Sequence, residues 1–234
     1  MVFNGLYEIL RKKYKQKKII GITGFVGSGK TFFANEFSEF LNKKTIDSVH
    51  FNMDIYNSTT RTERNEIISS LDKKYDPGWP KKAYAQNSKL IREHLTNIKQ
   101  EKSFFANNLC DSLTKELNFS IDFSFNGKYA TIKLGKEKEK YEKNNLWVLC
   151  EGVKIMEYKE FFDCIIFLNA KYTTRFNRIL ERNKMLPSPA KIKENLFKDV
   201  ENGLSFDHSL NEKQAQIIID NNNFYNRKII KIKD

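Results

Sequence analysis

The chain has 234 residues, 40% of them hydrophobic, and its 41 lysines and arginines against 29 acidic residues give a formal net charge of +12. This composition is typical of a globular domain and excludes a disordered chain, while the positive charge favours anionic partners such as nucleotides, phosphorylated metabolites or nucleic acid. No apolar run reaches the length of a membrane span, and the N-terminus lacks a signal-peptide pattern, so we expect a soluble, cytoplasmic protein. The three cysteines form no CxxC pair, which argues against a structural zinc site.

The N-terminal half predicts a helix, a strand and a second helix joined by a glycine-rich loop. Phe3, Leu6, Tyr7 and Leu10 recur at helical spacing, which indicates an amphipathic helix over residues 2–14. KIIGIT at 18–23 indicates a buried strand, and the apolar face after the loop indicates a helix as far as residue 42. Further along we expect a strand at 44–49, a helix at 60–73, a turn at 76–80 and a helix at 84–100.

The stretch 103–144 is the least regular part of the chain. Within it, apolar and polar residues alternate on both sides of Asn126-Gly127, which predicts a β-hairpin at 119–134. Strands are then expected at 146–150, 164–168, 216–220 and 227–233, with helices at 173–182 and 189–203. Buried strands separated by helices favour one α/β domain with a mostly parallel sheet covered on both faces.

Residues 24–31, GFVGSGKT, match the phosphate-binding pattern G-x-x-x-x-G-K-[ST] between a predicted strand and a predicted helix. Glycines let backbone N–H groups converge on phosphate oxygens, and the helix N-terminus adds a positive dipole. In this pattern Lys30 reaches the β- and γ-phosphates and the Thr31 hydroxyl ligates Mg²⁺. Gly21, inside the strand, is expected to allow close packing. The sequence therefore predicts binding of ATP and Mg²⁺ by Gly24, Gly27, Ser28, Gly29, Lys30 and Thr31.

Five further segments, on both sides of the hairpin, carry recognisable patterns: FNMDIYN (51–57), KYDPGWPKKAY (74–84), LWVLCEG (146–152), TTRFNRILERN (173–183) and QAQIIIDNN (214–222). They resemble the uridine kinase and phosphoribulokinase family of P-loop small-molecule kinases. The resemblance implies a three-layer P-loop sandwich with a mostly parallel central sheet, a β-hairpin insertion and an arginine-bearing lid helix. It also implies phosphate transfer from ATP to a hydroxyl of a small molecule, a nucleoside first. All of this falls in one domain, 1–234, with a helix in 1–17, the insertion at 103–144 and the lid at 171–203.

The same resemblance assigns roles to single residues. Asp54 would position the acceptor hydroxyl and take its proton, with Asp47 as a rival, and the alternative is a loop aspartate that caps a helix. Glu151 would hold Mg²⁺ together with Thr31. Arg178 and Arg182, with Lys30, would close over the transferring phosphates unless they form only a solvated helix face. Contacts to the substrate fall on Tyr56, Asp76, Trp79 and Arg175, of which Trp79 could instead be a core residue.

Departures from the family pattern leave the acceptor open. The hairpin lacks the Pro-x-Tyr-Asp-Phe signature of uridine kinases, so pantothenate, a nicotinamide riboside, dephospho-coenzyme A or a sugar acid are alternative acceptors. The basic block RKKYKQKK (11–18) makes an RNA-acting P-loop kinase or ATPase a second class. A nucleotide-binding regulator without catalysis is a third. The sequence indicates neither the oligomeric state nor a preference for ATP over GTP.

Overall fold

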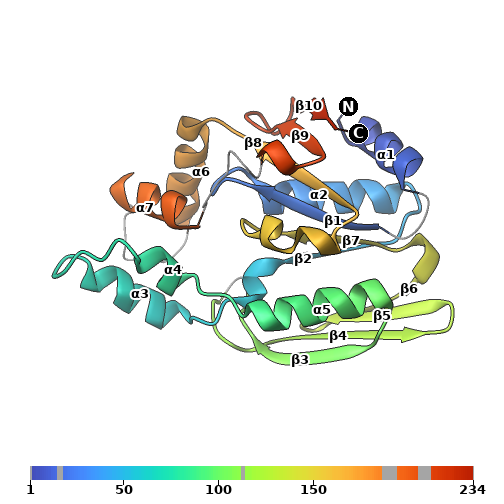
Figure 1. Cartoon of the computed structure of the whole chain (residues 1–234), viewed down its shortest axis with the longest axis horizontal. Helices are drawn as coiled ribbons and strands as arrows, with labels where there is room; N and C mark the ends of the chain where they lie inside the picture. Colours follow the sequence, from blue (N-terminus) through green and yellow to red (C-terminus); the bar gives the residue numbers. More distant parts are fainter. Residues whose placement is uncertain (1, 15–17, 112–113, 186–193, 205–211, 234) are drawn as a thin grey trace.

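The computed structural model describes residues 2–14, 18–111, 114–185, 194–204 and 212–233. Its centre is a six-stranded sheet in the order β10-β9-β8-β1-β7-β2 (Figure 1). All neighbouring strands are parallel except β10, which is antiparallel to β9. The α/β fold with a mostly parallel sheet is thus confirmed. The strands are β1 (Lys18–Gly24), β2 (Ser48–Asn52), β7 (Trp147–Glu151), β8 (Cys164–Asn169), β9 (Ile217–Asp220) and β10 (Lys228–Ile232).

Two helices cover one face of the central sheet. The helix α1 (Val2–Lys13) lies beside α2 (Lys30–Lys43) and β10, as Figure 1 shows. Its Leu6 and Leu10 are fully buried in a core that also contains Ile20 of β1 and Phe37 of α2. The predicted N-terminal amphipathic helix therefore packs on the sheet of its own chain.

Helix α5 (Ser88–Gln100) and the 3-10 segment η3 (Ile155–Phe161) cover the other face. Alternate residues of the same strands point to this side: Ile19 of β1 and Cys150 of β7 pack with Leu95 of α5. Because successive side chains of a strand point to opposite faces, one apolar run supplies both cores. The three layers expected for a P-loop sandwich follow from this pattern.

A second, antiparallel sheet, in the order β3-β4-β5-β6, forms the insertion (Figure 1). The predicted hairpin at 119–134 is confirmed, with Asn126 opposite Tyr129 at its turn. The sequence did not predict the outer strands. EKEKYE in β6 is a charged and mostly exposed edge strand, and the pairing of β3 is irregular between Ala106 and Leu109, so neither shows clean alternation. The four strands are β3 (Phe104–Leu109), β4 (Phe119–Asn126), β5 (Tyr129–Leu134) and β6 (Glu137–Glu142), and the short 3-10 helix η2 (Lys143–Asn145) follows.

The remaining helices surround the end of the sheet where β1, β2 and β7 finish. Two expectations were wrong in detail: β2 begins at Ser48, because residues 44–45 form the turn after α2, and the turn at 76–80 continues into a helix. Residues 186–193, in the middle of the expected lid, lie outside the described residues. Within the described residues no helix is long and apolar enough to cross a membrane. These elements are η1 (Met53–Tyr56), α3 (Arg61–Ser70), α4 (Trp79–Ala83), α6 (Tyr172–Met185) and α7 (Glu194–Leu204).

Candidate active site

The glycine-rich loop joins β1 to the N-terminus of α2, as the sequence predicts. Gly27 has a φ of 77°, and a Cβ there would lie 2.6 Å from the carbonyl oxygen of Arg175. Gly29, with a φ of 87°, is the N-cap of α2 and provides no side-chain cap. The first N–H groups of α2 are therefore available to an anion, in a conformation that other residues rarely adopt. At Gly21 a Cβ would lie 2.6 Å from Ile155, so the prediction of close packing is confirmed.

Lys30 and Thr31 both turn toward the ends of the neighbouring strands. The Lys30 ammonium donates to the carbonyl oxygens of Gly24 (3.2 Å) and Phe25 (3.1 Å) inside the loop. The Thr31 hydroxyl donates to Oε1 of Glu151 at 2.6 Å. A hydroxyl and a carboxylate oxygen side by side are ligand types that Mg²⁺ accepts, usually with phosphate oxygens and water as the others. The donor set thus fits a magnesium ion bound together with a nucleotide.

Glu151 is only 2% exposed, at the end of β7. Burial raises the pKa of its carboxyl to about 7, although the nearby Lys30 ammonium and the Thr31 hydrogen bond oppose this shift. A buried carboxylate with so little solvation gains strongly from a cation. No cluster of three or more His, Cys, Asp or Glu side chains that could hold a metal occurs among the described residues.

Asp54 lies in η1, directly after β2. Its backbone N–H donates to the side chain of Asn52 at 2.7 Å, which fixes the turn, and Asn52 is the register partner of Glu151 on β7. The negative charge of Asp54 raises the pKa of Glu151 and supports the charged form of Lys30. Asp54 therefore belongs to the same charge cluster as the phosphate-loop lysine.

Asp47, the rival of Asp54, lies at the opposite end of β2. Its carbonyl oxygen accepts from Trp147, the first residue of β7, and its Oδ2 accepts from the backbone N–H of Glu142 at 3.1 Å. The phosphate loop follows the other end of these parallel strands. The structure thus separates Asp47 from the site and brings Asp54 to it.

The three arginines of α6 face the phosphate loop in different ways. Arg175 is 5% exposed and donates to the carbonyl oxygens of Ala170 (2.9 Å) and Val26 (3.2 Å) while pairing with Glu201 of α7. Arg178 donates to the carbonyl oxygen of Ser28 at 3.2 Å. These two guanidinium groups therefore hold the backbone of the loop.

Arg182 is exposed and lies one turn further along α6. Its positive charge acts on Lys30 and Glu151, and also on Tyr84 and Lys115. The spacing of three and four residues predicted one common helix face, and Arg175 and Arg178 of this face contact the phosphate loop. The charge of Arg182 acts on the groups that also interact with Asp54.

The segment after β9 borders the phosphate loop. The Asn221 side chain donates to the carbonyl oxygen of Ser28 at 2.6 Å and accepts from Arg227 at 2.6 Å. Phe224 lies 3.8 Å below the Arg178 guanidinium and would be 2.7 Å from a Cβ at Gly29. The sequence analysis named the segment 214–222 among those that resemble the family but did not single out these side chains, since a polar run after a strand carries no distinctive spacing.

Tyr56 and Asp76, two of the residues assigned to the substrate, are engaged within the protein. Tyr56 is 2% exposed, and a 3.0 Å hydrogen bond joins its hydroxyl to Nδ1 of His94. The Asp76 carboxylate accepts from Lys82 at 2.6 Å and from the N–H of Gly78 at 2.8 Å. Their roles toward a substrate stay predictions.

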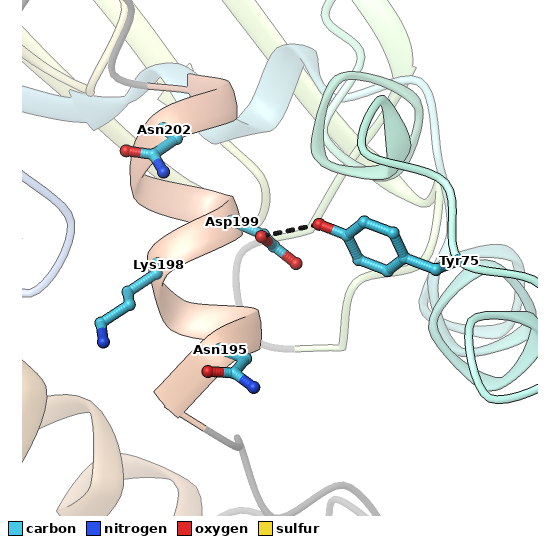
Figure 2. A pocket seen from close by; sticks show the side chains of 5 residues that line it. All are labelled: Tyr75, Asn195, Lys198, Asp199 and Asn202. Carbon is cyan, nitrogen blue, oxygen red and sulfur yellow. Dashed lines mark hydrogen bonds between the residues drawn. The ribbon is translucent and has the colours of Figure 1, made fainter.

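Trp79 is 2% exposed, and its indole N–H donates to Asp199 of α7 at 3.2 Å. The neighbouring Tyr75 donates to the same carboxylate at 2.9 Å across a pocket lined by α7 (Figure 2). This burial agrees with the alternative that Trp79 is a core residue, and its contact with a substrate stays a prediction. Trp79 joins α4 to α7.

Two basic residues that the sequence did not indicate interact electrostatically with the groups around Asp54. Lys115 and Arg64 come from separate segments, and Tyr84 lies within the electrostatic reach of Asp54, Arg64 and Arg182. Lys115 falls in the irregular stretch before the hairpin, where no motif marks it. Arg64 follows the capping box of Thr60 and Glu63, which explains the helix but not the position of the arginine.

A scan of the sequence against protein-family models finds no match, and a search of curated proteins finds no relative either. Solved structures do match. A possible uridine kinase from Bacillus stearothermophilus is 16% identical, with a TM-score of 0.53 and coverage of 92% of this chain and 96% of that one. D-glycerate 3-kinase from Cryptococcus neoformans is 11% identical, with a TM-score of 0.53 and coverage of 99% and 97%.

Phosphoribulokinase from Rhodobacter spheroides is also 11% identical, with a TM-score of 0.54 and coverage of 88% of this chain and 70% of that one. Identities this low establish a shared fold and leave the acceptor undetermined. The expected resemblance to the uridine kinase and phosphoribulokinase family is confirmed at that level. The chain therefore has the fold of the P-loop small-molecule kinases.

Proposed function

We propose that the chain is an ATP- and Mg²⁺-dependent kinase that transfers the γ-phosphate to a hydroxyl group of a small molecule. The observation that carries the proposal is the charge cluster formed by Lys30, Glu151 and Asp54 where β1, β7 and β2 end. This cluster brings together the phosphate-loop lysine Lys30, the candidate cation ligand Glu151 and the carboxylate of Asp54, which belongs to neither group. Such a third group is what a kinase needs to position an attacking hydroxyl.

In the proposed reaction the acceptor oxygen forms a bond to the γ-phosphorus, and the bond from that phosphorus to the bridging oxygen of ADP breaks. Asp54 takes the proton of the acceptor hydroxyl. Lys30 and Arg182 supply positive charge where negative charge develops on the transferring group. Thr31 and Glu151 would hold the Mg²⁺, which neutralises phosphate charge when bound.

The structure offers less support for the RNA-acting alternative. The exposed lysines and arginine of the basic block, at 11–13, lie at the end of α1, just before β1 begins. The phosphate loop follows the other end of this seven-residue strand, which spans about 23 Å at about 3.3 Å per residue. The block therefore contributes no charge at the phosphate loop itself, and only an RNA long enough to span this distance could contact both.

The test is Asp54→Asn, with Asp47→Asn as a matched control at the far end of β2. Loss of a general base lowers the rate by about 10²- to 10⁴-fold. We expect Asp54→Asn to lose phosphate transfer to this extent while a fluorescent ATP analogue binds within threefold of wild type, and Asp47→Asn to keep its activity. A fully active Asp54→Asn variant would contradict the proposal.

A further inference from the structure

Backbone contacts bring two positive side chains to the acceptor side of Asp54. The N–H of Cys110 donates to the carbonyl oxygen of Ile55 at 2.9 Å, which docks the segment before the hairpin onto η1. The N–H of Arg61 donates to the carbonyl oxygen of Lys115 at 3.0 Å, which docks the same segment onto the start of α3. Two elements distant in sequence are thus fixed around the turn that carries Asp54.

The backbone at Lys115 adopts a conformation that is uncommon for its residue type. Its φ is 63°, in the left-handed region, and its N–H donates to the carbonyl oxygen of Asp111 at 3.0 Å. Non-glycine residues at positive φ are uncommon and cluster at functional sites. The Lys115 side chain is half-buried, and its charge interacts with those of Asp54 and Arg182.

Arg64 completes the positive cluster. It is 8% exposed, and its guanidinium donates to the carbonyl oxygens of Thr60 (3.1 Å) and Lys115 (3.5 Å). Within the described parts of the chain, neither Arg64 nor Lys115 forms a salt bridge. The nearest acidic group of α3, Glu63, is exposed and bonded to Thr60. Arg64 also donates to the sulfur of Cys110 at 3.7 Å, and its charge acts on Glu63. Around Lys115, the positive charges of Arg64 and Arg182 face one carboxylate, that of Asp54, so the charges of the described residues favour a further anion here.

We propose that the acceptor is itself an anion: a hydroxylated small molecule whose carboxylate or phosphate group binds Lys115 beside Arg64 while its hydroxyl lies at Asp54. The inference rests on the proposed kinase function and names its substrate class. Bound ATP would occupy Lys30 and Arg182, whereas Lys115 and Arg64 lie on the acceptor side and keep their charge for the second ligand. Burial lowers the pKa of Lys115 while Asp54 opposes this, and an anionic ligand would add to the groups that favour the charged form.

The first experiment compares matched acceptors with the full-length protein and ATP-Mg²⁺. The pairs are D-glycerate with glycerol and ribulose 5-phosphate with ribulose, with uridine as a neutral nucleoside. We expect kcat/KM to be at least tenfold higher for an anionic member than for its neutral partner. A preference for uridine or for the neutral members would overturn the inference but leave the kinase proposal standing.

The second experiment uses Lys115→Met, with the exposed Lys138→Met of β6 as its matched control and Lys115→Arg as the conservative variant. Lys115→Met should raise the KM for the anionic acceptor at least tenfold, with kcat and the KM for ATP within threefold of wild type. Lys115→Arg should recover most of this loss, and Lys138→Met should resemble wild type. An unchanged KM in Lys115→Met would overturn the inference.

If none of these compounds is phosphorylated, the kinase proposal is left to the other acceptors, and binding then decides the anion site. Calorimetry with a non-hydrolysable ATP analogue present would measure the affinity for D-glycerate and ribulose 5-phosphate. Binding that weakens at least tenfold in Lys115→Met but not in Lys138→Met supports the site. No binding of either anion overturns it.

Discussion

Replacing Arg175 with Met should destabilise the contacts of α6 with the phosphate loop and with α7. The guanidinium is 6% exposed and contacts three partners at once: Val26 of the loop, Ala170 before α6 and Glu201 of α7. Removing one partner of a buried ion pair costs about 3–5 kcal/mol, because the other charge is left without compensation. Glu201 is 15% exposed and can recover some hydration. We therefore expect the free energy of unfolding to fall by about 3 kcal/mol.

The assay is urea unfolding of four proteins: wild type, Arg175→Met, Glu201→Gln and the double variant. Two charges in contact should show a coupling energy of about 1–3 kcal/mol, so the double variant should lose less than the sum of the single losses. The control is Arg92→Met, which breaks the half-exposed pair of Arg92 with Glu160 and should cost less than about 1 kcal/mol.

Two results would refute this reasoning. If Arg175→Met loses no more stability than Arg92→Met, the buried pair of Arg175 and Glu201 does not stabilise the fold. If stability is unchanged but the KM for the acceptor rises, then Arg175 contacts the substrate, as the sequence analysis predicted. An intermediate loss with zero coupling would assign the effect to the bonds with Val26 and Ala170 instead of the pair with Glu201.

Three further predictions concern the loop, the cation site and acid stability. Gly27→Ala should weaken binding of a fluorescent ATP analogue at least tenfold, because a Cβ would lie 2.6 Å from the Arg175 carbonyl at a φ of 77°; unchanged affinity would contradict this. Since the pKa of Glu151 is raised to about 7, protons should compete with Mg²⁺ for its carboxylate. The Mg²⁺ concentration that half-saturates ATP binding should therefore rise as pH falls from 8 to 6, and this rise should be absent in Glu151→Gln. Burial lowers the pKa of His94 to about 4, so the folded state binds fewer protons than the unfolded one and stability should fall by up to about 3 kcal/mol as pH drops from 6.5 to 4. Urea unfolding should show a shallower pH dependence in His94→Gln, which can still bond to Tyr56, and equal slopes would be inconsistent with a buried neutral histidine.

The parts of the fold that depend on local chemistry could be predicted from the sequence alone. The phosphate loop is set by glycines and a Lys-Thr pair within eight residues, and the hairpin by alternation around Asn126-Gly127. The continuous apolar runs indicated parallel strands because both faces of the central sheet are covered. Each of these signals lies within one or two neighbouring elements, so no knowledge of distant contacts was needed.

The side chains that surround Asp54 could be identified only from the tertiary structure. Asp54 and Asp47 lie seven residues apart in similar surroundings of sequence, and only their positions at opposite ends of β2 distinguish them. Trp79 is buried where Asp199 of α7, 120 residues away, accepts its indole N–H, and Lys115 interacts with Asp54 because its segment docks onto η1 and α3. Burial and charge at these positions come from contacts between segments far apart in the chain, which neither the periodicity nor the spacing of residues records.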